Sequence, residues 1–519
     1  MRRKNRGAWR CVLVPLAASL MTACVDLPPL DDRTVSSSLS GGIETRLEKA
    51  VSPPADAPPG ASGIFPLPKP RDAFSARVML ARAAERTLDV QYYIWNADAT
   101  GILMFDALYE AAERGVRVRL LLDDNNTKGL DRFLAVLDAH ANIEVRLFNP
   151  FVFRSMRWLG YLTDFSRLNR RMHNKSFTAD GQVTIVGGRN VGNEYFGASN
   201  DMLFSDLDVI AAGPVSSAVE QEFDRYWASQ SSYPADRLLA PASPEEGAGF
   251  AAAVRRVEAD PSAKHYIESI RRSEFVRNLM AGTLPLEWVP TRMISDDPAK
   301  ALGLASPEEM LLSRLKRVVE EPSHSLYLVS PYFVPGAQGV EAFSALAASG
   351  VKIHVLTNSL EATDVAAVHA GYAKRRQPLL EAGIELYESR RTMIEAARGS
   401  GASLGSSYSS LHAKTFSIDN RHVFIGSFNF DPRSANLNTE MGFVIYSPKL
   451  ASQITGAFKS RIPATSYQVK LDDASQLIWI EQVGKSSDRP VIYTQEPGTT
   501  FWQRSMVWFL SLLPIEWLL

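Results

Sequence analysis

The chain has 519 residues, 45% of them hydrophobic and 22% charged, which is typical of globular proteins and long enough for two or three domains. The formal net charge is −1, so the chain lacks the global positive field that holds nucleic acid non-specifically. The two cysteines, Cys11 and Cys24, both lie in the N-terminal segment, which excludes a disulfide or a thiolate-bound zinc or iron–sulfur centre from the body that follows.

Residues 1–24 predict an export signal. Five basic residues precede the apolar stretch CVLVPLAASLM, which is too short for a standard transmembrane helix. The run Leu20 to Cys24 resembles a bacterial lipobox, in which the cysteine becomes the lipidated first residue. We therefore expect a protein of the bacterial cell envelope, membrane-associated and anchored through Cys24 on the periplasmic side. An uncleaved anchor or an ordinary signal peptide is the alternative.

An α/β pattern then occurs twice, after a segment rich in Pro, Ser and Gly. The predicted strand, helix and strand cover residues 88–95, 102–115 and 116–125 in the first copy and 326–334, 340–350 and 351–358 in the second. This repetition predicts an α/β fold with a largely parallel sheet in each half. In chain order we expect a leader (1–24), a tether (25–70), a first half (71–242), a connector (243–300), a second half (301–465) and a C-terminal extension with an apolar tail (466–519).

One eight-residue pattern is present in both copies. HNKSFTAD and HAKTFSID have the same H-x-K-x4-D spacing, 239 residues apart, and each precedes a small-residue turn that ends in Asn. The candidate catalytic residues are His173, Lys175, Asp180, His412, Lys414 and Asp419. The candidate phosphate-binding and supporting residues are Asn190, Asn429, Ser427, Asp206 and Glu440.

Two imidazoles suit transfer of a phosphodiester. One attacks phosphorus to form a phosphohistidine, and the other protonates the departing alkoxide and later activates the incoming hydroxyl. The lysines and the side-chain amides would stabilise charge on the equatorial oxygens, so we expect neither a metal nor another cofactor. The six other histidines, at positions 140, 265, 324, 354, 369 and 422, occur outside this pattern and are interpreted as packed or exposed.

The acidic residues are predicted to do two different things. A reacting imidazole needs an acceptor at its other nitrogen, and Asp206 and Glu440 occupy matching places after the two motifs. Asp201 and Asp208 are alternatives to Asp206. The aspartates of the motifs themselves lie at strand-to-turn junctions, where bonding of turn amides is expected rather than contact with substrate.

These motifs resemble those of the phospholipase D superfamily. LDVQYYIW, SRLNRRMHNKSFT, NSLEATDVAAVHAGYA and LHAKTFSIDN resemble more specifically the bacterial cardiolipin synthases of the C type. The resemblance implies two related α/β halves with pseudo-two-fold symmetry and one shared active site. It also implies phosphatidyl transfer that makes cardiolipin from two phospholipids, with His173 as nucleophile and His412 as leaving-group acid. Phosphatidylglycerol and phosphatidylethanolamine are the candidate substrates; an auxiliary protein is unknown.

Three other functions stay open at this stage: a phospholipase D that hydrolyses phospholipids to phosphatidic acid, a metal-independent nuclease, and a non-catalytic lipid-binding protein. Two segments favour a membrane surface over nucleic acid as the partner. Residues 148–171 interleave aromatic and arginine side chains, and residues 501–519 are very apolar but interrupted by Arg504, Pro514 and Glu516. The alternative for both segments is packing on the body of the protein.

Overall fold

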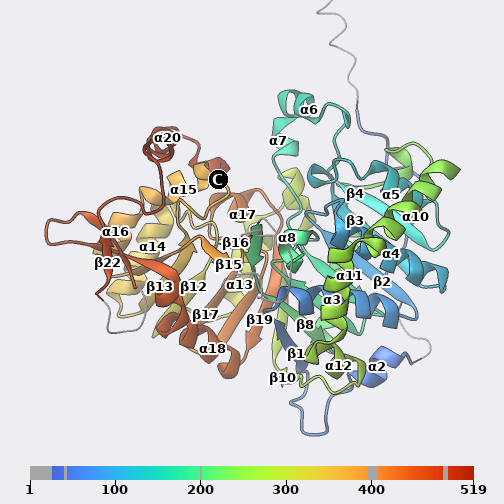
Figure 1. The fold of residues 1–519 in the computed structure, drawn as a ribbon, viewed down its shortest axis with the longest axis horizontal. Coiled ribbons are helices and arrows are strands. Elements are labelled where there is room, and N and C mark those ends of the chain that lie inside the picture. The colour runs from blue at the N-terminus through green and yellow to red at the C-terminus, as the bar shows by residue number, and fades with distance from the viewer. Residues whose placement is uncertain (1–25, 40–43, 199–201, 395–406, 483–488) are drawn as a thin grey trace, which may run out of the picture.

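The computed structural model describes residues 26–39, 44–198, 202–394, 407–482 and 489–519. Cys24 and Asp201 lie outside the described residues. Two large sheets, each covered by helices, lie side by side and make the α/β architecture that the sequence predicted (Figure 1). No helix within the described ranges has the length and hydropathy needed to cross a membrane.

The first sheet has the order β10-β1-β8-β6-β5-β2-β3-β4-β9. Its strands are β1 (Ser62–Leu67), β2 (Thr87–Tyr92), β3 (Arg117–Asp123), β4 (Ile143–Phe148), β5 (Ser176–Ala179), β6 (Val183–Gly187), β8 (Asp208–Ala212), β9 (Ser232–Pro234) and β10 (Glu287–Val289). The helices of this half are α2 (Arg46–Ala50), α3 (Pro70–Ala83), α4 (Ala99–Glu113), α5 (Asp131–Asp138), α6 (Arg157–Thr163), α7 (Phe165–Leu168), α8 (Asn193–Phe196) and α9 (Pro214–Trp227).

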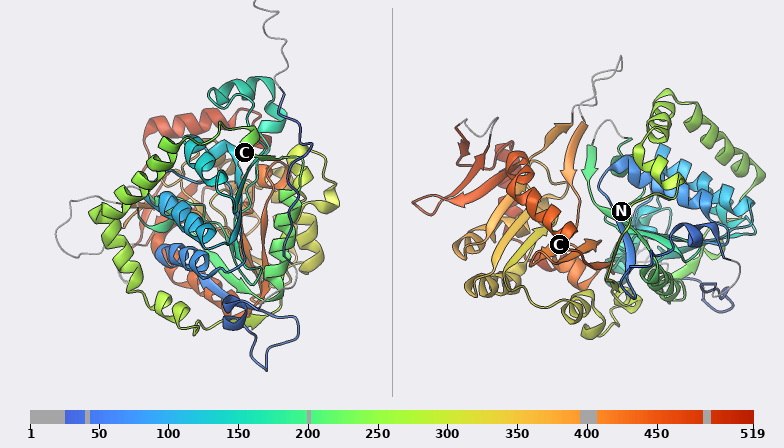
Figure 2. Two further views of the ribbon diagram at one scale, coloured as in Figure 1. Left: turned by 90° about the vertical axis from the view of Figure 1, so that its right-hand side faces the viewer. Right: turned by 90° about the horizontal axis from the view of Figure 1, so that it is seen from below.

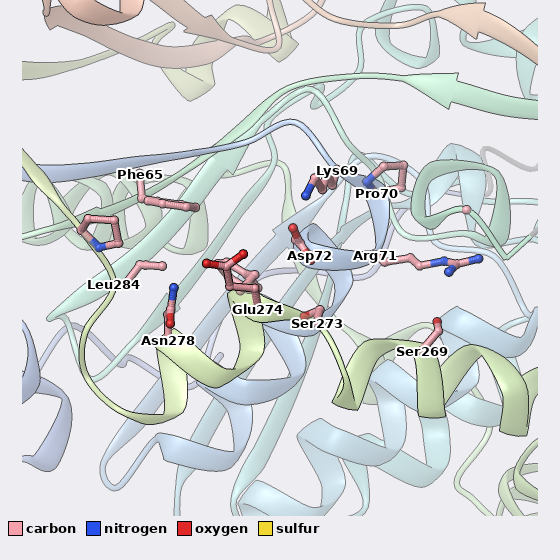
Figure 3. Close-up of a pocket in the computed structure, with 13 residues that line it drawn as sticks. Phe65, Lys69, Pro70, Arg71, Asp72, Ser269, Ser273, Glu274, Asn278 and Leu284 are labelled. Carbon is pink, nitrogen blue, oxygen red and sulfur yellow. The ribbon is translucent and has the colours of Figure 1, made fainter. Parts of the chain in front are cut away.

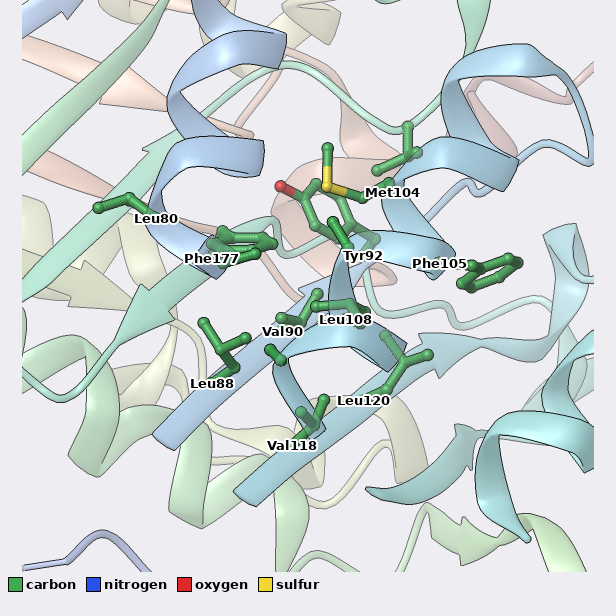
Figure 4. Packing of buried hydrophobic residues seen from close by; sticks show 14 of the residues in the cluster. Leu80, Leu88, Val90, Tyr92, Met104, Phe105, Leu108, Val118, Leu120 and Phe177 are labelled. Carbon is green, nitrogen blue, oxygen red and sulfur yellow. The ribbon is translucent and has the colours of Figure 1, made fainter. Parts of the chain in front are cut away.

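Both faces of the parallel strands are buried because helices lie on each side. Alternate residues of a strand point to opposite faces. Val90 and Leu120 pack against Leu108 of α4 on one face (Figure 4). Leu121, one position along β3, packs instead against Phe223 of α9 on the other. This is why the strands appear in the sequence as continuous apolar runs.

The second sheet has the order β11-β19-β18-β17-β12-β13-β14-β20-β21-β22. Its strands are β11 (Thr291–Ser295), β12 (Ser325–Val329), β13 (Lys352–Asn358), β14 (Glu385–Ser389), β17 (Thr415–Ile418), β18 (His422–Gly426), β19 (Met441–Tyr446), β20 (Ser466–Leu471), β21 (Leu477–Glu481) and β22 (Val491–Tyr493). Its helices are α13 (Leu311–Val318), α14 (Gly336–Ala348), α15 (Ala366–Ala373), α16 (Arg376–Glu381), α17 (Pro432–Asn436), α18 (Pro448–Lys459), α19 (Arg461–Thr465) and α20 (Phe501–Ser511).

The duplication is visible in the order of strands. The series β8-β6-β5-β2-β3-β4 and the series β19-β18-β17-β12-β13-β14 have the same order and the same directions. Only the last three strands of each series are parallel, so the expectation of largely parallel sheets is wrong. The tight turns at Asp180 and Asp419 make each motif strand one arm of a hairpin, and a hairpin pairs antiparallel.

The halves pack against each other through one face of β6 and β8 and one face of β18 and β19. Val186 and Val209 from the first half meet Ile425 and Phe443 from the second in one fully buried cluster. A small third sheet also joins the halves, because β7 (Met202–Ser205) pairs in parallel with β16 (Ser407–Leu411), which in turn pairs with β15 (Thr392–Ile394). The two halves therefore share a continuous interface (Figure 2).

Three segments outside the two halves differ from expectation. The predicted tether ends earlier than residue 70, because residues 62–67 form β1, which pairs with both β8 and β10. The predicted connector 243–300 forms α10 (Pro244–Ala259), α11 (Pro261–Arg271) and α12 (Glu274–Met280), then supplies β10 to one sheet and β11 to the other. The C-terminal extension adds β20, β21 and β22 to the second sheet before it ends in α20.

Candidate active site

Each motif brings its histidine and lysine to the interface between the halves. His173 and Lys175 lie directly before β5, and His412 and Lys414 lie directly before β17. Each lysine ammonium donates to the backbone carbonyl of the histidine two residues earlier, with 2.6 Å between Lys414 Nζ and the His412 oxygen. Residues two apart in an extended chain share a face, so imidazole and ammonium point the same way.

The carboxylates reach across the interface. His173 Nδ1 lies 2.8 Å from Glu440 Oε2 of the second half, and His412 Nδ1 lies 2.6 Å from Asp206 Oδ2 of the first. Each predicted acid therefore contacts the histidine of the other half: Glu440 contacts His173, and Asp206 contacts His412. Asp208, the alternative to Asp206, is instead buried beside Arg77, 2.9 Å from its guanidinium.

Backbone pairing fixes this crossed arrangement. Met172, the residue before the first histidine, forms a parallel bridge with Thr439, the residue before Glu440. Leu411, the residue before the second histidine, pairs in parallel with Ser205, the residue before Asp206. The same relation in both halves is the pseudo-two-fold symmetry of the site, expressed in hydrogen bonds.

Two further residues hold the motif backbone, and the sequence reading missed them. Asp123, at the end of β3, accepts the Met172 amide at 2.8 Å and pairs with Arg171 at 2.7 Å. Asn358, at the end of β13, accepts the Leu411 amide at 3.2 Å. The two follow Gly115 and Gly350 by the same eight residues, and this matching offset was the available signal.

The two carboxylates have different surroundings. Glu440 accepts hydrogen bonds from the hydroxyls of Ser427 and Ser434, and burial raises its pKa to about 7. Asp206 is also buried, but its pairing with His412 and the charge of Lys414 hold its pKa below the usual range. Gly188 matches Ser427 in position; a Cβ there would lie 2.2 Å from Asp206 Oδ1, so the first half has no room for the serine.

The basic side chains of the two halves lower one another's pKa values across the interface. Burial, followed by the charges of Lys175, Lys414 and His412, lowers the pKa of His173 well below its ordinary value. Burial and Lys414 lower the pKa of His412 to about 4. Charges from one half acting on the imidazole of the other mean that both motifs face one site.

The lysines are affected in the same way. Burial lowers the pKa of Lys175 well below its ordinary value and that of Lys414 to about 8. The pKa values of both imidazoles lie below neutral pH, so one is ready to act as a nucleophile. A phosphate anion between them would favour protonation of the other.

The remaining motif residues divide into amides that face the site and aspartates that do not. Asn190 and Asn429 are buried. Asn190 Nδ2 has no hydrogen-bond partner among the described residues, and an amide donor of this kind suits a phosphate oxygen. Asp180 and Asp419 have positive φ angles of 54° and 51° and accept amides from the turns before β2 and β12. Each lies seven residues beyond its histidine, roughly 20 Å along an extended chain, so these aspartates stabilise the backbone of the turns and do not contact the substrate.

Tyrosines border the imidazoles on both sides of the pseudo-two-fold axis. The ring of Tyr93 meets His173 edge-on at 4.9 Å between centroids, and Tyr195 meets His412 at 5.3 Å.

A separate cavity of about 750 Å³ opens between β1, the start of α3, and helices α11 and α12 (Figure 3). No motif residue lines this cavity, so it is not part of the site.

A duplicated α/β half with a His–Lys motif in each copy and one shared site defines the phospholipase D superfamily. Residues 78–227 and 315–462 match the family described as "Cardiolipin synthase, PLD-like domain", and the chain belongs to this family. The site residues themselves are assigned from their geometry in this chain.

Known relatives agree with this family. The chain is 52% identical over 487 residues to cardiolipin synthase C of Escherichia coli K12, covering 91% of this chain and all of the relative. It is 24% identical to a cardiolipin synthase of Staphylococcus aureus Mu50, covering 79% of this chain and 69% of that one. The crystal structure of phosphatidylserine synthase from Haemophilus influenzae Rd KW20 has the same fold, with a TM-score of 0.51, 14% identity, and coverage of 79% and 88%.

Proposed function

We propose that the chain is a phosphatidyltransferase that joins two phospholipids into cardiolipin through a phosphohistidine at His173. The chain acts on phospholipids and is a membrane-associated bacterial protein. The crossed pairs of His173 with Glu440 and of His412 with Asp206 carry this proposal. Because a carboxylate holds Nδ1 of each ring, Nε2 is the nitrogen of each that acts on a common phosphorus.

In the first step His173 Nε2 attacks the phosphorus of the donor phospholipid. The bond from phosphorus to the headgroup oxygen breaks, and His412 gives its proton to that oxygen, so the headgroup leaves as a neutral alcohol. The phosphatidyl group remains bonded to His173. Glu440 accepts the hydrogen bond from Nδ1–H throughout and stabilises the positive charge that the ring gains.

In the second step a hydroxyl of the acceptor phospholipid enters. His412 takes the proton from that hydroxyl, the oxygen attacks phosphorus, and the bond to His173 breaks. The product is a phosphodiester that joins two lipids, and both imidazoles return to their starting states. Lys175 and Lys414, with the amides of Asn190 and Asn429, stabilise the equatorial oxygens in both steps.

The difference between the carboxylates supports His173 as the nucleophile. A leaving-group acid must be an imidazolium, and Asp206, whose pKa is lowered, stays ionised beside His412 at neutral pH. Glu440 has a pKa of about 7, so it supplies less negative charge to His173 and supports protonation of that ring less. His173 must attack as the free base, so a neighbouring carboxylate that stabilises its protonated form only weakly suits this role.

The acceptor follows from the product. Cardiolipin has a glycerol bridge, so the acceptor must offer a glycerol hydroxyl, as phosphatidylglycerol does. The donor is a second phosphatidylglycerol, which releases glycerol, or phosphatidylethanolamine, which releases ethanolamine. We propose in addition that Cys24 is lipidated and holds the enzyme on the periplasmic side of the envelope.

Product analysis tests this assignment. Purified full-length protein is incubated with labelled phosphatidylglycerol, with and without phosphatidylethanolamine, in a chelator, and lipids are separated. Labelled cardiolipin is expected, with none from His173→Ala. Phosphatidic acid as the main product would assign the chain to hydrolysis. If no lipid product forms but plasmid DNA is cleaved in a parallel reaction, the chain would be assigned to the nucleases. If neither lipid nor DNA is converted, the remaining function would be lipid binding without catalysis.

A further inference from the structure

The exposed apolar side chains of the protein are concentrated in two segments. Eleven of the eighteen large apolar side chains that the described residues expose lie there. The first segment is α6–α7, which exposes Met156, Trp158, Leu162 and Phe165. The second is α20 with the short helix η5 (Glu516–Leu518), which exposes Phe501, Trp502, Met506, Trp508, Phe509, Leu512 and Trp517. We call these two segments together the docking face.

All exposed tryptophans of the described residues belong to the docking face. Trp502 is 78% exposed and Trp158 63%, whereas tryptophans elsewhere are buried or half-buried. Soluble proteins rarely leave a contiguous aromatic patch in water without a partner for it. Tryptophan in particular favours the boundary between water and lipid, where its ring is apolar and its N–H stays hydrated.

The two segments come from different halves but lie at the same edge of the molecule. Figure 1 shows α6 and α7 at the top right and α20 at the top left, with α17 between them; the turned view in the left panel of Figure 2 keeps both at the top. Both segments are close to the site along the chain or through α17, because α7 ends five residues before His173 and α17 begins three residues after Asn429.

One arginine connects the segments above the site. The guanidinium of Arg433, at the start of α17, donates to the carbonyl and side-chain oxygens of Asn169, just after α7, at 3.0 and 2.9 Å. The same side chain donates to the carbonyl of Leu518 in η5 at 3.0 Å. α20 itself rests on α15 through Val507, which packs against Leu360 and Ala370. The docking face is therefore held in a fixed relation to the site.

The start of the described chain lies at the same edge. The segment that begins at residue 26 emerges beside α6 at the top of Figure 1 and of the left panel of Figure 2. Cys24 precedes Asp26 by two residues, a covalent reach of about 7 Å. A lipid on Cys24 would therefore enter a membrane on the side where the docking face lies.

We propose that the docking face binds the surface of a phospholipid bilayer and holds the active site close to the headgroups. The proposal rests on the proposed function for one point, that the substrates are themselves membrane lipids. A phospholipid with two acyl chains leaves the bilayer at great cost, because each CH₂ exposed to water costs about 0.8 kcal/mol. Two aromatic segments linked to the site through Arg433 would let the headgroup reach the histidines while the acyl chains stay in the bilayer.

Quenching by brominated lipids tests the contact directly. Vesicles of phosphatidylethanolamine and brominated phosphatidylglycerol are added to the full-length protein, and tryptophan emission is measured. The variant with Trp158, Trp502, Trp508 and Trp517 changed to Phe is expected to lose most of the quenching. In the matched control variant Ile492→Ala, on exposed β22, the tryptophan emission is expected to be quenched as strongly as in the unchanged protein. Quenching that survives the loss of all four tryptophans would overturn the proposal.

Activity on two forms of substrate separates this proposal from the proposed function. Leu162→Ala with Trp508→Ala is expected to lower the rate on vesicles by about tenfold or more, since two large apolar contacts are lost. The rate on detergent mixed micelles, which supply lipid without a bilayer, should stay within about twofold. Equal losses on both substrates would overturn the docking role. If vesicles quench the tryptophan emission of the unchanged protein but the protein makes no cardiolipin, only the proposed function would be overturned.

A second copy of the chain is the competing occupant of this face. Sedimentation velocity of the unchanged protein and of the four-tryptophan variant distinguishes it. A monomer in both cases supports the bilayer as occupant. A dimer that dissociates in the variant, together with unchanged vesicle quenching, would reassign the face to self-association.

Discussion

The two histidine–carboxylate pairs have the same backbone frame but different electrostatics. In both, the residue before the histidine pairs with the residue before the carboxylate of the other half. Yet burial raises the pKa of Glu440 to about 7, while positive neighbours lower the pKa of Asp206. The comparison teaches that duplication preserved the geometry of the site, whereas single side chains around each carboxylate divided its chemical roles.

Hydrogen bonds to the two carboxylates do not explain the difference. The hydroxyls of Ser427 and Ser434 donate to Glu440 and favour its ionised form. In the first half Gly188 replaces the serine, because Asp206 comes too close for a side chain. Burial outweighs the hydroxyls and the charge of Lys175 at Glu440, whereas His412 and Lys414 outweigh burial at Asp206, so Glu440 is easier to protonate.

The sharpest test of unequal roles is removal of each histidine. We expect His173→Ala and His412→Ala each to reduce cardiolipin formation by about 10⁴-fold or more, because both groups act in both steps. A substrate with a nitrophenyl headgroup needs no acid to leave. With it, His412→Ala should release one equivalent of nitrophenolate in a burst, measured by absorbance, and His173→Ala none.

The opposite pattern would exchange the two roles. A burst from both variants would contradict a single phosphohistidine. Thermal unfolding of each variant serves as the control, since a loss of structure would abolish both reactions together.

The second test replaces the carboxylates by amides. Asp206→Asn removes a full negative charge beside His412, and we expect kcat to fall by about 10²- to 10³-fold. Glu440→Gln removes a charge that is only partly present at neutral pH, and we expect a loss of about tenfold. Steady-state kinetics at pH 7 measures both, and equal losses would show that the two pairs are chemically equivalent.

The third test is the pH dependence of kcat/KM, which reports groups of the free enzyme. Glu440 must be ionised to stabilise the charge on His173 through the hydrogen bond from Nδ1–H, so activity should rise as pH increases through about 7. Lys414 must keep its proton to bind phosphate, so activity should fall as pH increases through about 8. Glu440→Gln should remove the acid limb and keep the alkaline one. Persistence of the acid limb in that variant would assign it to another group.

Much of the fold was predictable because its signals are local. The repeated apolar strands and amphipathic helices identified the parallel part of each sheet. The spacing of the motifs identified His173 and His412. β1 was missed because SGIFPL is short and adjoins a Pro-rich segment; its strand conformation depends on pairing with β8 and β10, which are distant in sequence.

The candidate site shows the same limit. Positions after the two motifs were enough to name Glu440 and to propose Asp206, with Asp201 and Asp208 as alternatives, as acceptors for the imidazoles. They were not enough to say which acid meets which ring, because that depends on how the halves pack and on the parallel bridges at Thr439 and Ser205. Asp123 was overlooked because only a comparison of the two copies separates it from other acids at strand ends: it follows a glycine by the same eight residues as Asn358 does.

The crossed pairs have a consequence for how such a chain changes over generations. A substitution that shifts Thr439 moves the acceptor of His173, a residue encoded more than 260 codons away. Natural selection therefore acts on the two copies jointly, and neither is available as a spare in which mutations accumulate harmlessly. The repeat has lost the redundancy that a duplication first supplies.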